Sequence, residues 1–370
     1  MHTASDPKSI DDTLPTAVQD VLATYLAAKR AQLTAAEPSA GDAVDALADF
    51  VLGGGKRIRP TFAWWGWRGA GGAADGAEAE KVLTAISALE LIQGCALVHD
   101  DLMDDSALRR GKPTVHVDFA GRHRAAGWHG DPDKFGAAAA ILIGDLALAW
   151  ADDLFTEAGL TAAQLLAAGP AWRGMRAEML AGQYLDVLTQ SDGGAPLPPA
   201  EAAMRVARLK TAAYTVERPL HLGAALAGAG ERTVGALRAF GGDIGVAFQL
   251  RDDLLGMFGD TAVTGKPAGD DLREGKRTLL IAVAVTNAEQ AGRDATVEMI
   301  HEALGNPKLS ADDLDRVREA LVDLGAVAEV EARIERLTGT ALEALASAEL
   351  AAPAGDRLAA LADAATRRSY

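Results

Sequence analysis

The chain of 370 residues carries 52 acidic and 36 basic side chains, which gives a formal net charge of −16 at pH 7. Nucleic acids select basic surfaces, so this balance argues against a nucleic-acid partner, and an anionic substrate would need local Lys and Arg clusters together with metal. The single cysteine, Cys95, lies in an apolar run, which excludes a disulfide framework, predicts a core position and suits a reducing cytoplasm.

The composition favours one large all-α domain. The chain is rich in Ala and Leu, has 5% aromatic residues, and repeats apolar residues at spacings of three and four. Residues 1–13 are polar and predict a loose tail with no signal peptide, and residues 14–370 form the predicted helical domain. The most apolar stretch, 137–143, is much shorter than the roughly 20 residues that cross a bilayer, so no transmembrane segment is expected.

Helices are predicted at 14–33 and 43–52, separated by a Pro-Ser-Ala-Gly turn. The second helix ends in three glycines, 53–55, followed by the basic segment Lys-Arg-Ile-Arg-Pro at 56–60. Glycine allows close backbone approach and the cations attract anions, so a phosphate-binding loop is predicted. It is not a Walker loop, because Arg57 stands where a hydroxyl residue is required. A helix stop followed by solvated cations is the alternative.

A mostly apolar helix from about residue 77 leads to the first acidic motif, Asp100-Asp101-Leu102-Met103-Asp104. Residues four apart share a helix face, so Asp100 and Asp104 should point the same way, with Asp101 beside them. Converging carboxylates need cations, and hard oxygen ligands suit Mg²⁺, which commonly binds substrate phosphates as well. Paired acids more often lie on a solvated helix face, but acids at the end of an apolar run are unusual as surface decoration.

The residues after this motif predict a phosphate contact and then a connection. In Arg109-Arg110-Gly111-Lys112-Pro113, glycine and proline turn the chain, and the arginines can each make two hydrogen bonds to phosphate oxygens. Taken alone, the arginine pair would more often be surface charge. Residues 119–135 are rich in Gly, His and Asp and predict a loop, whose histidines lack the spacing of a helical zinc site.

Helices resume at 136–158, 171–189 and 201–229, and the last of these is interrupted by Lys210-Thr211 and a later proline. On an interior face, this pair would place a cation and a hydroxyl near a reacting group. A lysine whose ammonium extends to solvent is the alternative.

The second acidic motif lies on a predicted helix at 241–256, which carries Gln249, Asp252 and Asp253. The following segment, 264–278, is rich in glycine and contains Lys266 and Lys276, which predicts a flexible lid that brings positive charge to a bound polyphosphate. The C-terminal third predicts amphipathic helices, one of which starts at a capping Ser310.

The ordered set of motifs resembles the trans-isoprenyl diphosphate synthases, the polyprenyl synthetase family. Its members are all-α, with a single large antiparallel helical barrel around a deep central cavity, and are usually homodimers. They catalyse the Mg²⁺-dependent head-to-tail (1'-4) condensation of isopentenyl diphosphate with an allylic diphosphate (dimethylallyl, geranyl or farnesyl), and Mn²⁺ is able to substitute for Mg²⁺. The resemblance therefore implies a cytoplasmic prenyltransferase of isoprenoid biosynthesis.

The resemblance also implies roles for individual residues. Carried onto this chain, the Mg²⁺ ligands are Asp100, Asp104 and Asp252, supported by Asp101 and Asp253. The cationic clamp on the allylic diphosphate is Arg109, Lys210 and Lys266, and the isopentenyl diphosphate site is Lys56, Arg59, Gln93 and Arg110. Thr211 and Gln249 would present oxygen dipoles to an allylic cation, with released diphosphate as the base.

Gln93 and Gly256 depart from the family's pattern, and Cys95 and Ala96 predict the length of the product. Gln93 replaces a common histidine, and Gly256 replaces an acid that often ends the second motif. Cys95 and Ala96 are small where synthases of fifteen-carbon products often have an aromatic floor, which predicts twenty-carbon geranylgeranyl diphosphate. The alternatives are a farnesyl or longer polyprenyl diphosphate synthase, a terpene cyclase, and a non-catalytic subunit of a heteromeric synthase.

Overall fold

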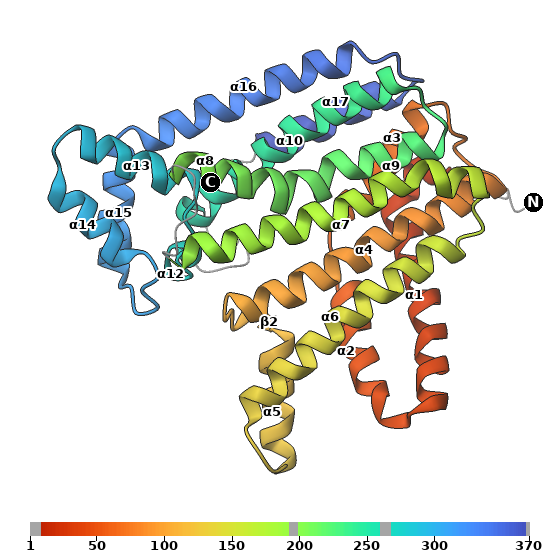
Figure 1. Cartoon of the computed structure of the whole chain (residues 1–370), viewed down its shortest axis with the longest axis horizontal. Helices are drawn as coiled ribbons and strands as arrows, with labels where there is room; N and C mark the ends of the chain where they lie inside the picture. The colour runs from red at the N-terminus through yellow and green to blue at the C-terminus, as the bar shows by residue number, and fades with distance from the viewer. Residues whose placement is uncertain (1–8, 192–198, 260–267, 368–370) are drawn as a thin grey trace, which may run out of the picture. The chain divides into compact units, whose positions relative to one another are not determined.

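The computed structural model describes residues 9–191, 199–259 and 268–367, and these confirm the all-α prediction (Figure 1). Apart from one short hairpin, the regular elements of this part of the chain are helices. In chain order the elements are α1 (Ile10–Ala36), the 3₁₀ turn η1 (Pro38–Ala40), α2 (Gly41–Leu52), α3 (Ile58–Gly69), α4 (Ala77–Met103), β1 (Leu108–Arg109), β2 (Lys112–Pro113), α5 (Val115–Ala126), α6 (Pro132–Glu157), α7 (Ala162–Gln190), α8 (Pro199–Val206), the π-helix η2 (Ala207–Glu217), α9 (Arg218–Leu226), α10 (Glu231–Phe258), α12 (Asp270–Arg273), α13 (Leu279–Gln290), α14 (Asp294–Ala303), α15 (Ala311–Asp323), α16 (Ala326–Ala346) and α17 (Ala354–Thr366).

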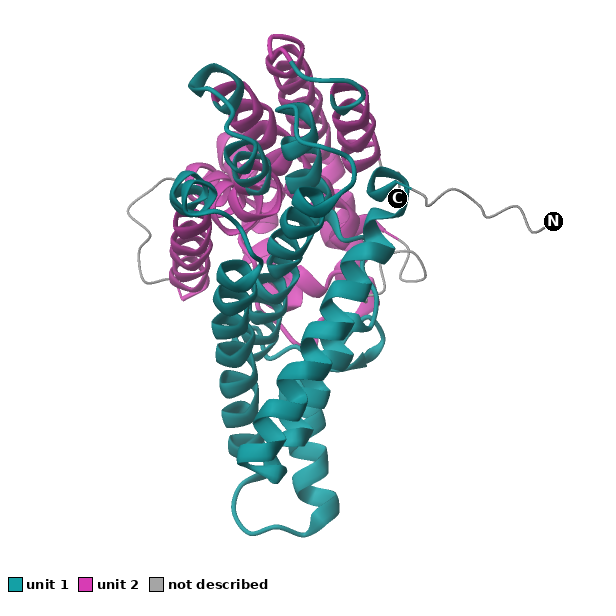
Figure 2. Cartoon of the chain, turned by 90° about the vertical axis from the view of Figure 1, so that its right-hand side faces the viewer, with its two compact units in different colours: residues 1–171, 219–234, 350–354 teal, residues 172–218, 235–349, 355–370 magenta. Residues whose placement is uncertain are grey.

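The contacts divide the chain into two compact units, coloured separately in Figure 2. Unit 1 contains residues 1–171, 219–234 and 350–354, and unit 2 contains 172–218, 235–349 and 355–370. Four of the divisions fall inside helices, namely α7, α9, α10 and α17. One domain spanning residues 14–370 stays a prediction.

Helix α4 forms the centre of unit 1 and leads to the first acidic motif. It packs against α6, α3 and α1, and its buried positions go round the whole helix instead of forming one stripe. Three of those positions are polar, and each has a partner: Ser87 donates to the Leu83 carbonyl, Glu90 pairs with Arg57, and Asp101 pairs with Arg109. Packing along most of its length therefore anchors α4, whose last turn carries Asp100.

Helices α4 and α6 are both long and apolar enough to cross a membrane, judged by length and composition alone. In α4, 72% of the most apolar window is buried inside the protein, as in the core helix of a water-soluble fold. In α6, 39% is buried, and Ile141 and Leu142 are exposed on its surface. The absence of a transmembrane segment stays a prediction.

The first helix begins at Ile10, so residues 10–13 are not part of a loose tail as predicted. The Ser9 hydroxyl accepts a hydrogen bond from the Asp11 amide, which caps the helix. The Asp11 carboxylate also accepts from the Trp64 indole and pairs with Arg68, so contacts distant in sequence hold this end of the helix in place.

The prediction of a loop over 119–135 is wrong, because most of the segment belongs to α5 and the start of α6. Phe119, Ala120 and His123 are buried, and α5 packs against α6. Asp131 caps α6 by accepting from the amides of the two residues after Pro132. The helix therefore forms because one face is buried by tertiary packing, which the polar composition of the other face concealed.

Unit 2 is built around a core shared by α10, α13, α15 and α16, whose buried members include Leu254, Leu280 and Val317. Arg251 is buried on α10 and makes two hydrogen bonds to Glu331 of α16, at 2.7 and 2.6 Å. The Ser310 hydroxyl accepts from the Asp313 amide, which confirms the predicted helix start.

The predicted interruption of the 201–229 helix is confirmed, and its form is a π-helix, η2. π-Helical segments are rare and frequently occur at functional sites. Lys210 and Thr211 lie in this segment.

Candidate active site

The first acidic motif occupies the last turn of α4 in unit 1. The Asp104 amide donates to the Asp100 carbonyl at 2.9 Å, so the turn that separates these two residues is closed as in a helix. Their side chains therefore leave the same face of α4. The C-terminal end of a helix carries partial negative charge, so carboxylates there favour nearby cations.

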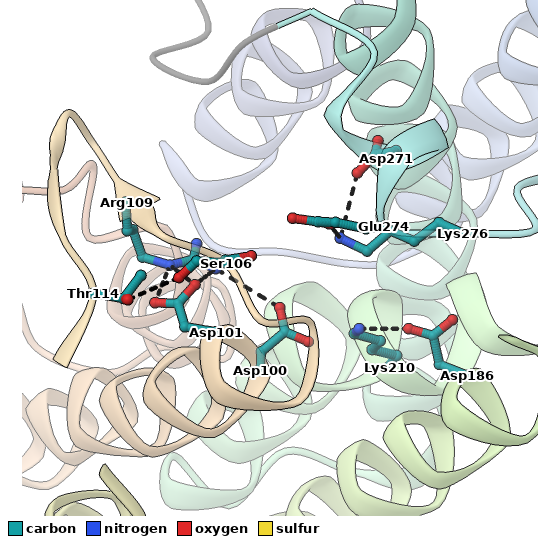
Figure 3. Close-up of polar contacts among 10 residues, drawn as sticks. All are labelled: Asp100, Asp101, Ser106, Arg109, Thr114, Asp186, Lys210, Asp271, Glu274 and Lys276. Carbon is teal, nitrogen blue, oxygen red and sulfur yellow. Dashed lines mark hydrogen bonds and ion pairs between the residues drawn. The ribbon is translucent and has the colours of Figure 1, made fainter. Parts of the chain in front are cut away.

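Arg109 supplies one such cation (Figure 3). Its Nε lies 2.7 Å from both carboxylate oxygens of Asp101, and its NH2 atom lies 2.6 Å from one of them. The same NH2 atom is 3.7 Å from Asp100 Oδ2. Asp101 is 1% exposed, so its charge is compensated inside the protein by Arg109 and the Asp101 side chain is not open to solvent.

A small hairpin presents Arg109 to the acids. Strand β1 pairs with β2 through Arg109 opposite Lys112, and the two turn residues, Arg110 and Gly111, both have positive φ. Two left-handed residues in sequence define the turn that suits a tight hairpin. The Thr114 hydroxyl donates to the Ser106 carbonyl at 2.8 Å, closing the base of the hairpin.

The second arginine of the hairpin reaches the glycine loop. Arg110 NH1 donates to the Gly54 carbonyl at 2.8 Å, and the guanidinium groups of both Arg110 and Arg57 lie beside Gly55. Desolvation, and then the positive charges of Arg109 and Arg57, lower the pKa of Arg110. The contribution of these neighbouring positive charges to the lowered pKa indicates a cluster of cations, which a bound anion would stabilise.

The members of the basic segment 56–60 lie in different environments. Arg57 is buried in the left-handed conformation at the start of α3 and is paired with Glu90 at 2.6 Å and with Gln19, so its role is to hold α1, α3 and α4 together. Lys56 is exposed and Arg59 is buried. Gln93 is partly buried on α4.

In unit 2, Lys210 pairs with an acid that the predicted site did not include (Figure 3). Its Nζ lies 2.6 Å from Asp186 Oδ2, and Asp186 is buried on α7. The backbone of Lys210 lies against Gly182 so closely that a methyl group at Gly182 would overlap it. In the sequence, Asp186 follows Gly182-Gln183 on a helix face that is otherwise apolar. An acid in that position could have been predicted to face the interior.

A hydrogen-bond chain links η2 to the second acidic motif. Thr211 Oγ1 donates to Gln249 Oε1 at 2.6 Å, and Gln249 Nε2 donates to Asp253 Oδ1 at 2.7 Å. Three predicted residues are thereby brought together within unit 2. Burial, and then the charge of Asp271, raise the pKa of Asp253 to about 8, against the opposing effect of the Gln249 hydrogen bond.

Lys266 and Lys276 were predicted to lie on a lid that follows the second acidic motif. Lys276 lies 2.5 Å from Glu274 Oε2 and 3.3 Å from Asp271 Oδ1 (Figure 3). Asp252 is exposed on α10. Lys266 lies outside the described residues.

The donor set fits magnesium held jointly with a diphosphate. Within residues 9–191, 199–259 and 268–367, no three His, Cys, Asp or Glu side chains are close enough to hold one metal ion. Mg²⁺ usually takes one or two carboxylates and completes its shell with water and substrate phosphates, so such a cluster is not required. Burial and the nearby charge of Asp271 both raise the pKa of Asp253, and a bound cation would stabilise the charged form of that carboxylate.

The described part of the chain is almost entirely helical, and its helices α4 and α10 carry acidic motifs near their C-terminal ends, a pattern typical of enzymes that act on diphosphates. Residues 42–321 match the family model described as polyprenyl synthetase. The chain belongs to the polyprenyl synthetase family and is accordingly a prenyltransferase.

Individual relatives agree with that assignment. The chain is 35% identical to the geranylfarnesyl diphosphate synthase of Aeropyrum pernix over 286 residues, 76% of this chain and 80% of that protein. It is 32% identical to the geranylgeranyl diphosphate synthase of Sulfolobus acidocaldarius, covering 70% of this chain and 71% of that protein. Among solved structures, the geranylgeranyl pyrophosphate synthase of Corynebacterium glutamicum, complexed with isoprenyl diphosphate and magnesium, is 45% identical with a TM-score of 0.92, over 97% of this chain and 99% of that one.

Proposed function

We propose that this chain catalyses the Mg²⁺-dependent head-to-tail condensation of isopentenyl diphosphate with an allylic diphosphate, and that its product is geranylgeranyl diphosphate. The main support is the position of Arg109, whose guanidinium pairs with the buried Asp101 and lies 3.7 Å from the Asp100 carboxylate at the end of α4. The chain's similarity to a synthase solved with isoprenyl diphosphate and magnesium supports it.

In this proposal the carboxylates of Asp100, Asp104 and Asp252 hold magnesium on the allylic diphosphate, supported by Asp101 and Asp253. Magnesium, when bound, neutralises the charge that develops on the departing diphosphate. Arg109, Lys210 and Lys266 bind the same diphosphate. The Asp186 carboxylate positions the Lys210 ammonium, because a 2.6 Å ion pair restricts an otherwise flexible side chain.

The hydroxyl of Thr211 stabilises the allylic cation in this scheme. Thr211 donates its hydrogen to Gln249, so its oxygen lone pairs are left to face positive charge. Gln249 is in turn oriented by donating to Asp253. Isopentenyl diphosphate binds at Lys56, Arg59, Gln93 and Arg110, where Arg110 and Arg57 concentrate positive charge beside Gly55.

The length of the product is set along α4 before the first motif. Cys95 is buried and Ala96 is partly buried, and both side chains are small, so a growing prenyl chain can pass that level. The relatives described above are named for different prenyl diphosphates: geranylfarnesyl diphosphate for the Aeropyrum pernix synthase and geranylgeranyl diphosphate for the Sulfolobus acidocaldarius synthase. The small pair at 95–96 favours the twenty-carbon product.

The protein is proposed to act as a cytoplasmic homodimer. The exposed side chains of Ile141 and Leu142 on α6 provide apolar surface suited to a second copy. Light scattering during gel filtration measures the oligomeric state. A Leu142→Glu variant is expected to shift the protein towards the monomer, and a wild-type protein that elutes as a monomer would contradict the dimer.

The activity is tested by incubating the protein and magnesium with isopentenyl diphosphate and, separately, dimethylallyl, geranyl or farnesyl diphosphate. Chromatography of the products is expected to give geranylgeranyl diphosphate. A terpene cyclase would instead release hydrocarbon from one allylic substrate without consuming isopentenyl diphosphate. A non-catalytic subunit would form no product alone. Either result would refute the proposal.

A further inference from the structure

The second acidic motif lacks a side chain at residue 256. Asp252 and Gly256 are four residues apart on α10, so they share one helix face. An acid at residue 256 would therefore project beside Asp252. Because residue 256 is glycine, this chain has no carboxylate at that position of the motif.

Another carboxylate fills the space. A Cβ atom added to Gly256 would lie 2.5 Å from Asp271 Oδ2 and 3.4 Å from Asp271 Cγ, and among the described residues outside its own helical turn it would meet no other residue within 4 Å. The Asp271 carboxylate thus occupies the volume in which a side chain at residue 256 would begin. Any residue larger than glycine would displace it.

The backbone fixes Asp271 in this position. The Gly269 amide donates to the Gly256 carbonyl at 2.9 Å, which ties the segment before α12 to the end of α10. The Lys276 amide donates to the Asp271 carbonyl at 2.9 Å, and the Lys276 ammonium lies 3.3 Å from Asp271 Oδ1 (Figure 3). Oδ1 therefore faces the lysine, while Oδ2 is the oxygen against Gly256.

We propose that Asp271 supplies, from α12, the carboxylate that the second acidic motif lacks at residue 256. Gly256 and Asp271 then form one functional unit: the glycine provides the space and the aspartate provides the charge. In the proposed synthase, on which this inference rests, Asp271 adds to the negative charge of Asp252 and Asp253 that attracts magnesium with a diphosphate.

Relocating the carboxylate tests this pairing. The series comprises the wild type, Asp271→Asn, Gly256→Asp, and the double variant Gly256→Asp/Asp271→Gly, with Asp270→Asn as the control for loss of one charge in the same helical turn. Thermal melting verifies that each variant folds. Calorimetric titration with inorganic pyrophosphate, with and without magnesium, measures binding independently of turnover.

We expect Asp271→Asn to weaken magnesium-dependent pyrophosphate binding by about tenfold or more, the usual effect of losing a group that supports a metal site. Asp270→Asn should bind like the wild type. Gly256→Asp alone crowds two carboxylates into one space and should bind and melt less well than the double variant, which should recover most of the affinity. If Asp271→Asn fails to fold, the double variant still decides the question.

Three results would overturn the proposal. They are wild-type binding by Asp271→Asn, equal losses in Asp271→Asn and Asp270→Asn, and no recovery in the double variant. Prenyl transfer by the wild type is measured in parallel. A wild type that makes no prenyl product refutes the proposed function, whereas the pyrophosphate titrations decide the role of Asp271.

Discussion

Arg109 Nε lies 2.7 Å from both carboxylate oxygens of Asp101, a residue that is 1% exposed. The buried Asp101 carboxylate accepts several hydrogen bonds from the Arg109 guanidinium and holds it in place, because leaving either charge unpaired would be costly. Arg109 is therefore already oriented before a substrate arrives, with its NH2 atom 3.7 Å from Asp100.

Replacing Arg109 with lysine should reduce kcat while the protein remains folded. Lysine keeps the charge but cannot span Asp101 and a phosphate with a rigid fork. We expect a loss of about 10- to 100-fold, equivalent to the 1.5–3 kcal/mol of hydrogen bonds to charged groups. Steady-state kinetics measures it, and Arg122→Lys on α5, an exposed pair with Asp118, is the control. A kcat unchanged in Arg109→Lys would contradict the assigned clamp.

Asp100→Ala should abolish turnover and leave the fold intact. Its side chain is 15% exposed and is a proposed magnesium ligand, so its loss removes a role in chemistry more than a packing contact. Asp105→Asn is the control, because the Asp105 side chain is fully exposed just after this turn and its left-handed backbone tolerates asparagine. Activity assays and circular dichroism measure both effects. Retained activity in Asp100→Ala would refute its metal role.

Gly245→Ala should lower both stability and kcat. A methyl group at Gly245 would lie 2.6 Å from Ala212 Cα, next to Thr211 in η2, so the π-helix must shift. We expect destabilisation of about 1–3 kcal/mol, as for overpacked cores. For Gly235→Ala on the same helix, the added methyl group lies within 4 Å of no described residue outside its own helical turn, so the change should be neutral or stabilising by up to about 1 kcal/mol. Equal melting temperatures and rates in the two variants would show that η2 is not held by this contact.

Cys95 should resist alkylation in the native protein. Burial, and then the charge of Asp145, raise the pKa of the Cys95 thiol to about 12. A raised thiol pKa keeps the neutral, unreactive form at every pH below it, so reaction begins only as the pH approaches that value. Mass spectrometry after iodoacetamide treatment at about pH 8 should find Cys95 unmodified in the native protein and modified in urea. Rapid labelling without urea would contradict this.

Ala96→Phe should shorten the product. Ala96 is partly buried on α4 one turn before Asp100, and an aromatic ring there would block chains longer than farnesyl. Chromatography of the products should show farnesyl diphosphate in place of geranylgeranyl diphosphate. An unchanged distribution would place the floor of the cavity elsewhere.

The sequence alone predicted the features that depend on local spacing. Apolar residues at three and four predicted an all-helical chain, the capping serine predicted the start of α15, and the Lys210-Thr211 segment predicted an interrupted helix. The family followed from the order of the motifs along the chain.

Tertiary structure decided the partners of the charged residues. Asp186 with Lys210, Asp101 with Arg109, and Asp271 with Gly256 are contacts between residues 24, 8 and 15 positions apart, created when helices or turns pack. The helical state of 119–126 likewise depends on burial against α6. Helical periodicity sets which face a side chain leaves, but only packing sets what that face meets.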